Sequence, residues 1–237
     1  MKVNGIYFQY NLEIAIFNKK GPHQSFKKNF ESSKKLRERL KKIIIENAKL
    51  AQRIGADSFV PFIEAEIIIG PENSSQFFSE LIGEIKKVYK GKVVWWGAFK
   101  GGTLKDAGKI NFSDYDVICF SHSPYMESEK MPKKAHKKEI KKAIDFLGKV
   151  AKKWKTDLMI CEVSLFEGGV TEEYVNDVYI DLLFSQSREK VKGIFVLDFI
   201  DFPFLKYLKK FREDATLFMN LWGRRTLEKV KEWYQKF

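Results

Sequence analysis

The chain has 237 residues, of which 44% are hydrophobic and 15% aromatic, and its formal net charge at pH 7 is +12. This length allows one sizeable hydrophobic core, and the aromatic content excludes a disordered chain. No run of about 18 apolar residues occurs, which excludes a membrane-spanning helix. The first residues lack the cationic start and cleavage site of a signal peptide, so a cytoplasmic location is expected.

Apolar strand-like runs alternate with amphipathic helical stretches along the chain. Most runs are apolar on both faces, as strands are when helices cover one face and a barrel interior fills the other. Short connections between strand and helix imply parallel strands, in a barrel or an open doubly wound sheet. The predicted strands are 5–17, 58–65, 92–99, 116–121, 157–164 and 193–199, and the predicted helices are 31–54, 74–90, 132–154, 171–188, 203–213 and 224–236, with a shorter crossing near 103–113.

Local signals support the helices. Apolar residues recur at spacings of three and four within 36–54, and Gly55 supplies the stop that follows. Ser74 or Ser75 is predicted to cap the start of the next helix. No glycine-rich phosphate loop follows the first strand, which argues against a nucleotide-binding Rossmann fold.

The positive charge lies mostly in helical stretches where lysine is mixed with acidic residues. That mixture is typical of solvated helix faces, and a Lys/Glu/Ile-rich chain also fits a heat-adapted source. A basic nucleic-acid-binding protein is an alternative interpretation, but no nucleic-acid motif supports it. Cys119 and Cys161 lie inside apolar runs and are predicted to be buried free thiols, with a disulfide as the alternative. No Cys/His spacing resembles a zinc site and the three histidines are scattered, so no metal site is expected.

Side chains suited to carbohydrate chemistry follow the carboxyl ends of the predicted strands, where parallel barrels place their active sites. Carboxylates can act on a glycosidic bond, and flat rings can stack on sugars. These side chains belong to Glu64, Glu66, Trp95, Trp96, His122, Tyr125, Glu162 and Asp198.

Each of these residues also has a simpler interpretation. A single glutamate at a strand end can be merely solvated, His122 can be a hydrogen-bonded loop residue, and Asp198 can cap a helix. Neighbouring side chains of a strand point to opposite faces of the sheet, so only one of Trp95 and Trp96 can point toward the rim where the strands end. Two glutamates on separate strands, one within the apolar run ICEVS, favour a function.

The segment IEAEIII followed by SSQFFSELIGEIKKVYKGKVVWW resembles the fourth-strand acid/base segment of clan-A glycoside hydrolases. Within it, GEIKKVYKGKVVWW is most similar to the β-mannanase-type family 113. DLMICEVSLFEGG resembles the seventh-strand segment that presents the nucleophile, and GIFVLDFIDFP and MNLWGRRTLEKVKEW resemble the eighth strand and the closing helix. The resemblance covers about residues 40–237 and implies a single partial TIM-type (β/α) barrel domain over 1–237, with about six strand–helix units.

The resemblance implies a retaining glycoside hydrolase that needs no cofactor, with Glu66 as the acid/base and Glu162 as the nucleophile. Its substrate would be a β-linked oligo- or polysaccharide, mannan- or glucan-like. Tyr125 is the candidate donor to the nucleophile carboxylate. The expected substrate-binding residues are Glu64, Trp95, Trp96, His122, Tyr125 and Asp198.

The chain departs from the family pattern at three positions. Ala65 stands where the clan has Asn, Glu64 stands where a small residue is expected, and Leu197 replaces a sugar-stacking Trp. Strand alternation would direct Glu64 toward the barrel interior beside Glu66, and either glutamate could be the acid. A catalytically inactive barrel remnant that binds carbohydrate or a protein partner is therefore the alternative function.

The resemblance also assigns the strand at 5–17 to the third strand of the barrel, so two strand–helix units are absent. Six units leave two strand edges unpaired. An incorrect start site, a partner chain that completes the barrel, a homodimer across the gap or a rearranged sheet would each account for this.

Overall fold

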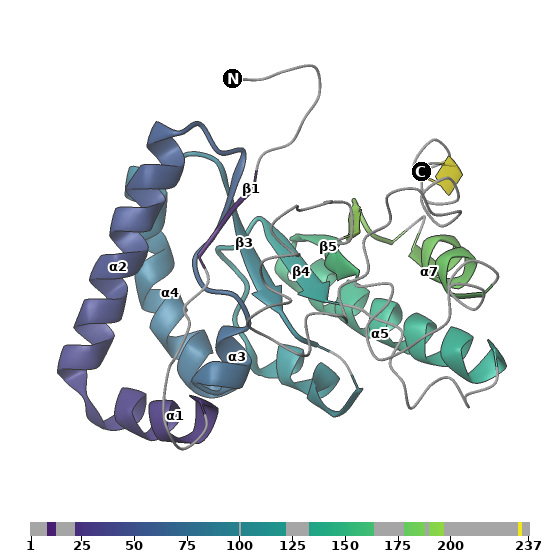
Figure 1. Ribbon diagram of the computed structural model, residues 1–237, viewed down its shortest axis with the longest axis horizontal. Coiled ribbons are helices and arrows are strands. Elements are labelled where there is room, and N and C mark those ends of the chain that lie inside the picture. Colours follow the sequence, from purple (N-terminus) through teal and green to yellow (C-terminus); the bar gives the residue numbers. More distant parts are fainter. Residues whose placement is uncertain are drawn as a thin grey trace, which may run out of the picture. The chain divides into compact units, whose positions relative to one another are not determined.

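Helices and short parallel strands alternate along the chain in the computed structural model (Figure 1). The structure describes residues 9–12, 22–99, 101–121, 133–163, 178–187, 190–196 and 232–233, without the side chains of 22–26, 101–102, 133–136, 162–163 and 195–196. The elements are β1 (Gln9–Asn11), α1 (Pro22–Ser32), α2 (Lys34–Arg53), β2 (Ser58–Val60), α3 (Ala65–Ile68), α4 (Pro71–Val88), β3 (Lys92–Gly97), η1 (Gly101–Lys109), β4 (Val117–Ser121), α5 (Lys133–Trp154), β5 (Asp157–Val163), α7 (Ile180–Ser187) and β6 (Ile194–Val196).

The chain divides into two compact units, residues 1–120 with 149–158 and residues 121–148 with 159–237. In the first unit β1 pairs with β2, β2 with β3 and β3 with β4, and every pairing is parallel. The first residue of β5 continues this sheet, since the amide of Asp157 donates to the carbonyl of Asp116 at 3.1 Å. The prediction of parallel strands in sequential order is confirmed.

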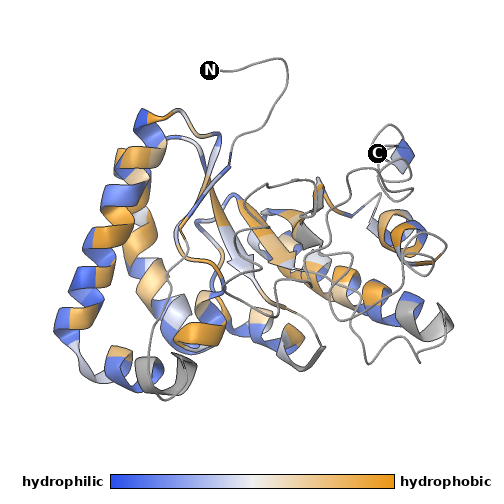
Figure 2. Ribbon diagram, in the orientation of Figure 1, coloured by the Kyte–Doolittle hydropathy of each residue, from blue (hydrophilic) through white to orange (hydrophobic). Residues whose placement is uncertain are grey.

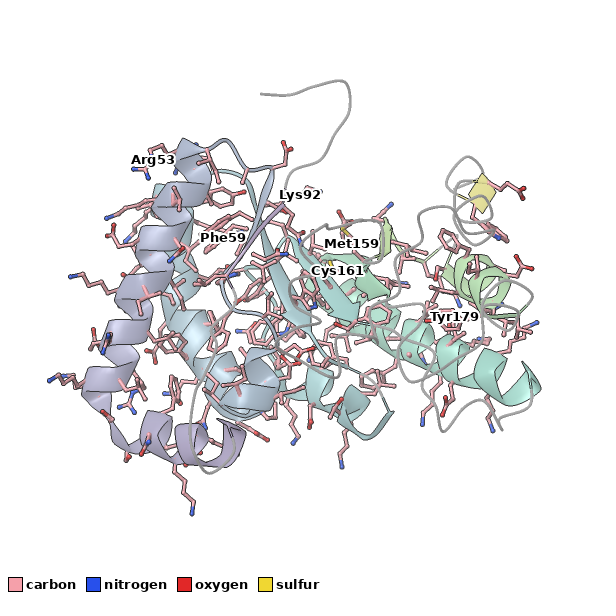
Figure 3. The ribbon with its side chains drawn as sticks, viewed as in Figure 1. Arg53, Phe59, Lys92, Met159, Cys161 and Tyr179 are labelled. Carbon is pink, nitrogen blue, oxygen red and sulfur yellow. The ribbon has the colours of Figure 1, made fainter. Side chains whose placement is uncertain are left out.

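One face of this sheet packs against helices α2 and α4. Phe59 of β2 is fully buried there, with its ring 6.0 Å from Tyr10 and 5.8 Å from Tyr89, which follows α4 (Figure 3). The hydroxyl of Tyr10 donates to Asn47 of α2 at 2.7 Å. Alternation along a strand places Val93 and Trp95 on the same side as Phe59, because Phe59 pairs with Val93. We call this side the helix face.

The amphipathic pattern of α2 accounts for its packing. Its apolar residues recur at spacings of three and four, and Figure 2 shows orange and blue segments alternating along the helix. The side chain of Ser33 accepts a hydrogen bond from Leu36 N at 3.2 Å and caps the helix start. The helix ends at Arg53, and Gly55 follows with φ +69°, as a C-terminal stop requires. The buried residues of α2 are Leu40, Ile44, Ala48 and Ala51.

Helix α4 begins three residues earlier than predicted. Gly70 is its N-cap and Pro71 its first residue, because proline has the helical φ already set and needs no hydrogen-bond acceptor for its nitrogen. Ser74 is therefore inside the helix and buried, where its hydroxyl donates to Pro71 O at 3.0 Å. Ser75 also lies within α4, so the predicted serine cap is wrong.

In the second unit β5 pairs in parallel with β6, through Ile160 with Ile194 and Val163 with Val196. Helix α7 packs against Trp233, whose ring stacks on Phe184 at 5.6 Å. The predicted helix at 203–213 and most of that at 224–236 lie outside the described residues.

The cysteine prediction is wrong, because Cys119 and Cys161 are both disulfide-bonded. Apolar runs around each cysteine indicate burial, but they carry no information on which side chains meet. The described helices include none with the length and hydrophobicity needed to cross a membrane.

Candidate active site

The segment after β2 forms a turn and a short helix, although the sequence predicted a strand as far as residue 65. The strand ends at Val60 because Pro61 cannot donate to a strand ladder. Glu64 is then the N-cap of α3, and Glu66 is in its first turn. The expected strand alternation of Glu64 and Glu66 is therefore wrong.

Glu64 has a left-handed backbone, with φ 53° and ψ 37°. This conformation costs a non-glycine residue about 1–2 kcal/mol. Hydrogen bonds on both sides hold it: its amide donates to Trp96 O at 2.8 Å, and its carbonyl accepts from Ile67 N at 3.0 Å. Glu64 is half-buried and is tied to the end of β3.

The Glu66 carboxyl group is buried against the end of β3, and the residue is only 4% exposed. Its Oε1 accepts a hydrogen bond from the amide of Ala98 at 2.6 Å. Three other buried polar atoms in the described part of the chain have no hydrogen-bond partner: Glu66 Oε2, Trp95 Nε1 and Tyr115 Oη. The end of β3 thus holds one carboxyl oxygen and leaves the other unsatisfied.

The carboxyl group of Glu66 lies on the helix face of β3. A Cβ built on Gly97, which is on the same face as Trp95, would be 3.0 Å from Glu66 Oε1. The Trp95 ring packs edge-to-face with Phe78 of α4 at 5.6 Å and with Tyr115 at 5.4 Å. Trp95 is therefore a core residue, and strand alternation directs Trp96, also buried, to the opposite face.

Burial raises the pKa of Glu66 from 4.5 to about 7. The backbone hydrogen bonds of Glu66 and Ala98 lower this pKa, and the charge of Glu64 raises it. The indole of Trp95 also lowers it, although no hydrogen bond of ordinary geometry joins the two side chains. Glu66 therefore exchanges a proton near neutral pH.

Gly97 leaves the space that the Glu66 carboxyl group occupies. A Cβ at this position would be 2.6 Å from Cζ of Phe99 as well as 3.0 Å from Glu66 Oε1. Gly97→Ala is therefore expected to lower the free energy of unfolding by about 1–3 kcal/mol. Gly83→Ala is the matched control, since nothing lies within 4 Å of its added Cβ, and in helix α4 it should stabilise by about 0.5–1 kcal/mol. Equal unfolding midpoints in urea for the two variants would contradict this packing.

The other predicted site residues are only partly described. Glu162 lies in β5, but its side chain is outside the described residues, and so are His122, Tyr125 and Asp198. The described residues contain no group of three His, Cys, Asp or Glu side chains that could hold a metal ion. Ala98, whose amide donates to Glu66, and the buried Tyr115 were not identified from the sequence. Gly97 was a usable signal, because a glycine at a strand end often marks a place where another group lies close to the backbone.

Comparison with known proteins finds relatives in structure but not in sequence. No family model matches the chain, and no curated protein matches it significantly. A GH113 β-1,4-mannanase complex matches with a TM-score of 0.64 and 18% identity over 98% of this chain and 75% of the mannanase. A second GH113 β-1,4-mannanase matches with a TM-score of 0.59, 21% identity and 94% and 67% coverage.

The fold is that of the GH113 β-mannanases. An endo-β-1,4-mannanase from Thermotoga petrophila shares it, with a TM-score of 0.63 and 11% identity over 98% of this chain and 58% of that enzyme. The predicted partial TIM-type barrel and the resemblance to family 113 are thus confirmed at the level of fold. Active sites of such barrels lie at the carboxyl ends of the strands. In this GH113-like barrel, Glu64 and Glu66 follow the carboxyl end of β2.

Proposed function

We propose that the protein is a glycoside hydrolase that cleaves a β-linked oligo- or polysaccharide, mannan- or glucan-like, with retention of configuration and without a cofactor. The observation that carries this proposal is a pair of glutamates after the carboxyl end of β2, in a fold shared with β-mannanases.

The mechanism needs two carboxyl groups, one from the Glu64–Glu66 segment and one from Glu162. The acid donates its proton to the glycosidic oxygen as the bond from this oxygen to the anomeric carbon breaks, and the Glu162 carboxylate forms a new bond to that carbon. The same group, now a carboxylate, takes a proton from water, whose oxygen displaces Glu162. The sequence assigns the acid to Glu66, and Glu64 is the other candidate in this segment.

Further parts of the proposal rest on the sequence. His122, Tyr125, Asp198 and Trp96 would line the sugar site, with Tyr125 as donor to Glu162. A homodimer or a partner chain would complete the barrel. A cytoplasmic location also stays a prediction.

The product stereochemistry tests the reaction. β-1,4-Linked manno- and gluco-oligosaccharides would be incubated with the full chain, and the anomeric protons of the new reducing ends followed by NMR within the first minutes. Release of the β-anomer first is the expected result. Release of the α-anomer first would show an inverting enzyme and contradict the double-displacement mechanism.

A second candidate is a catalytically inactive barrel that binds carbohydrate. It is favoured by the 4% exposure of Glu66 and by Ala65 in the position before it. Calorimetric binding of the same oligosaccharides, without hydrolysis over several days, would support this candidate and exclude the enzyme.

A further inference from the structure

We propose that Glu64 is the carboxylate that contacts the substrate, and that Glu66 is a positioning residue that holds the Glu64 segment against β3. This inference rests on the proposed function and assigns its acid/base. It also divides between two residues what the sequence assigned to Glu66 alone.

The first argument concerns reach. A general acid must come within hydrogen-bond distance of the leaving oxygen. Glu66 is 4% exposed, and its Oε2 is buried without a partner among the described residues. Its carboxyl group lies on the helix face, beside a Trp95 ring that packs on Phe78. A sugar would have to open this aromatic core to reach Glu66, whereas Glu64 is half-buried at the end of the strand.

The second argument concerns the backbone. Two hydrogen bonds clamp the segment to β3: the Glu64 amide donates to Trp96 O at 2.8 Å, and Ala98 N donates to Glu66 Oε1 at 2.6 Å. The segment from 64 to 66 is therefore hydrogen-bonded at both of its ends to the segment from 96 to 98. The second bond fixes the start of α3, and Glu64 is its left-handed N-cap. Glycine would adopt this φ without strain, so a glutamate here indicates that its side chain is needed.

The charged groups around Glu66 agree with this division. Among the charged residues that the structure describes, Glu64 acts on the Glu66 carboxyl group, and the neighbouring α4 presents Phe78 to Trp95. Tyr115 is neutral, because burial raises its pKa well above the ordinary value. From α1, the Nζ of Lys27 lies 3.1 Å from a Cβ built on Gly70, at the start of α4.

Chemical rescue tests the assignment. We expect Glu64→Gly, a change that suits the left-handed backbone, to lower kcat on β-1,4-oligosaccharides by about 10²–10⁴. On 2,4-dinitrophenyl β-mannoside or β-glucoside the loss should be smaller in the first step, because this leaving group needs no proton. Azide should then accelerate turnover and yield the β-glycosyl azide, since azide attacks the anomeric carbon and releases Glu162 without base assistance.

Glu66 variants should respond differently. Glu66→Gln is expected to lower kcat by about tenfold through misplacement of Glu64. Glu66→Ala should lower the melting temperature, and azide should accelerate neither variant. Azide rescue of Glu66→Ala but not of Glu64→Gly would overturn the assignment, and so would rescue of neither variant while the wild type is active. Glu46→Gln, an exposed change on α2, is the control for azide effects on the wild-type site.

A thiol-exposure measurement separates this inference from the proposed function. Cysteines placed by Glu64→Cys, Glu66→Cys and the exposed reference Glu46→Cys would be titrated with a disulfide reagent under non-reducing conditions, where the native pair is already bonded. The cysteine at 64 should react about tenfold faster than that at 66. A wild type that hydrolyses no aryl glycoside would refute the proposed function, and equal reactivity at 64 and 66 would refute the inference in either case.

Discussion

Glu162→Ala is expected to lower kcat on β-1,4-linked oligosaccharides by about 10⁴–10⁶, the range seen when a catalytic nucleophile is removed. Without this carboxylate no glycosyl-enzyme can form, so the reaction loses its first step rather than part of its binding energy. The melting temperature should change little, because Glu162 is the last residue but one of β5 and the apolar residues before it stay in place. Initial rates on oligosaccharides and on an aryl glycoside measure the effect.

Asp157 offers a matched control at the opposite end of the same strand. It forms an ion pair with Lys92 at 3.6 Å, and both side chains are about half exposed. Asp157→Ala should keep kcat near the wild-type value, since such an exposed pair contributes at most about 1 kcal/mol to stability. Azide should rescue Glu162→Ala with the α-glycosyl azide as product. Unchanged activity of Glu162→Ala would show that another group is the nucleophile.

The stability of the wild type relative to Glu66→Gln should fall as the pH rises from 4.5 to 7. The pKa of Glu66 is about 7 in the folded protein and 4.5 as its ordinary value. The folded state therefore holds its proton more tightly than the unfolded chain does. The contribution of Glu66 to the free energy of unfolding is complete below pH 4.5 and is lost as the pH rises through 7. The loss is about 3 kcal/mol in all, at about 1.4 kcal/mol per pH unit.

Urea unfolding of both proteins at several pH values measures this difference. The Gln variant cannot titrate, so subtraction removes every other ionising group. Glu46→Gln is the control: the Lys49 ammonium lowers the pKa of Glu46, whose contribution changes only below pH 4.5. A wild-type curve parallel to that of Glu66→Gln between pH 4.5 and 7 would mean that Glu66 is not buried as a neutral acid.

Local sequence signals were sufficient for the order of elements. The apolar stripe of α2, its end before Gly55 and the apolar runs of β3 and β4 depend on neighbours within a few residues. Hydrophobic periodicity carries that information directly. The parallel arrangement followed from strand–helix alternation, and the pairings of β1 to β4 confirm it.

The details of the candidate site were not predictable in the same way. The left-handed backbone of Glu64, in the turn after Val60, depends on a hydrogen bond to Trp96. These two residues are 32 positions apart in the sequence. The burial of Glu66 depends on Gly97 and on Ala98 N from the next strand.

By itself the sequence determined that helices alternate with parallel strands and that glutamates follow those strands, because both properties are encoded by short-range periodicity and residue type. The choice of a barrel over an open sheet came from the resemblance to clan-A glycoside hydrolases. Only the tertiary structure decided which glutamate is buried. Exposure and pKa depend on atoms that distant segments bring together: Ala98 N and the Trp95 ring hold the Glu66 carboxyl group in an apolar core. Glu64, two residues earlier, stays half-buried at the end of the strand.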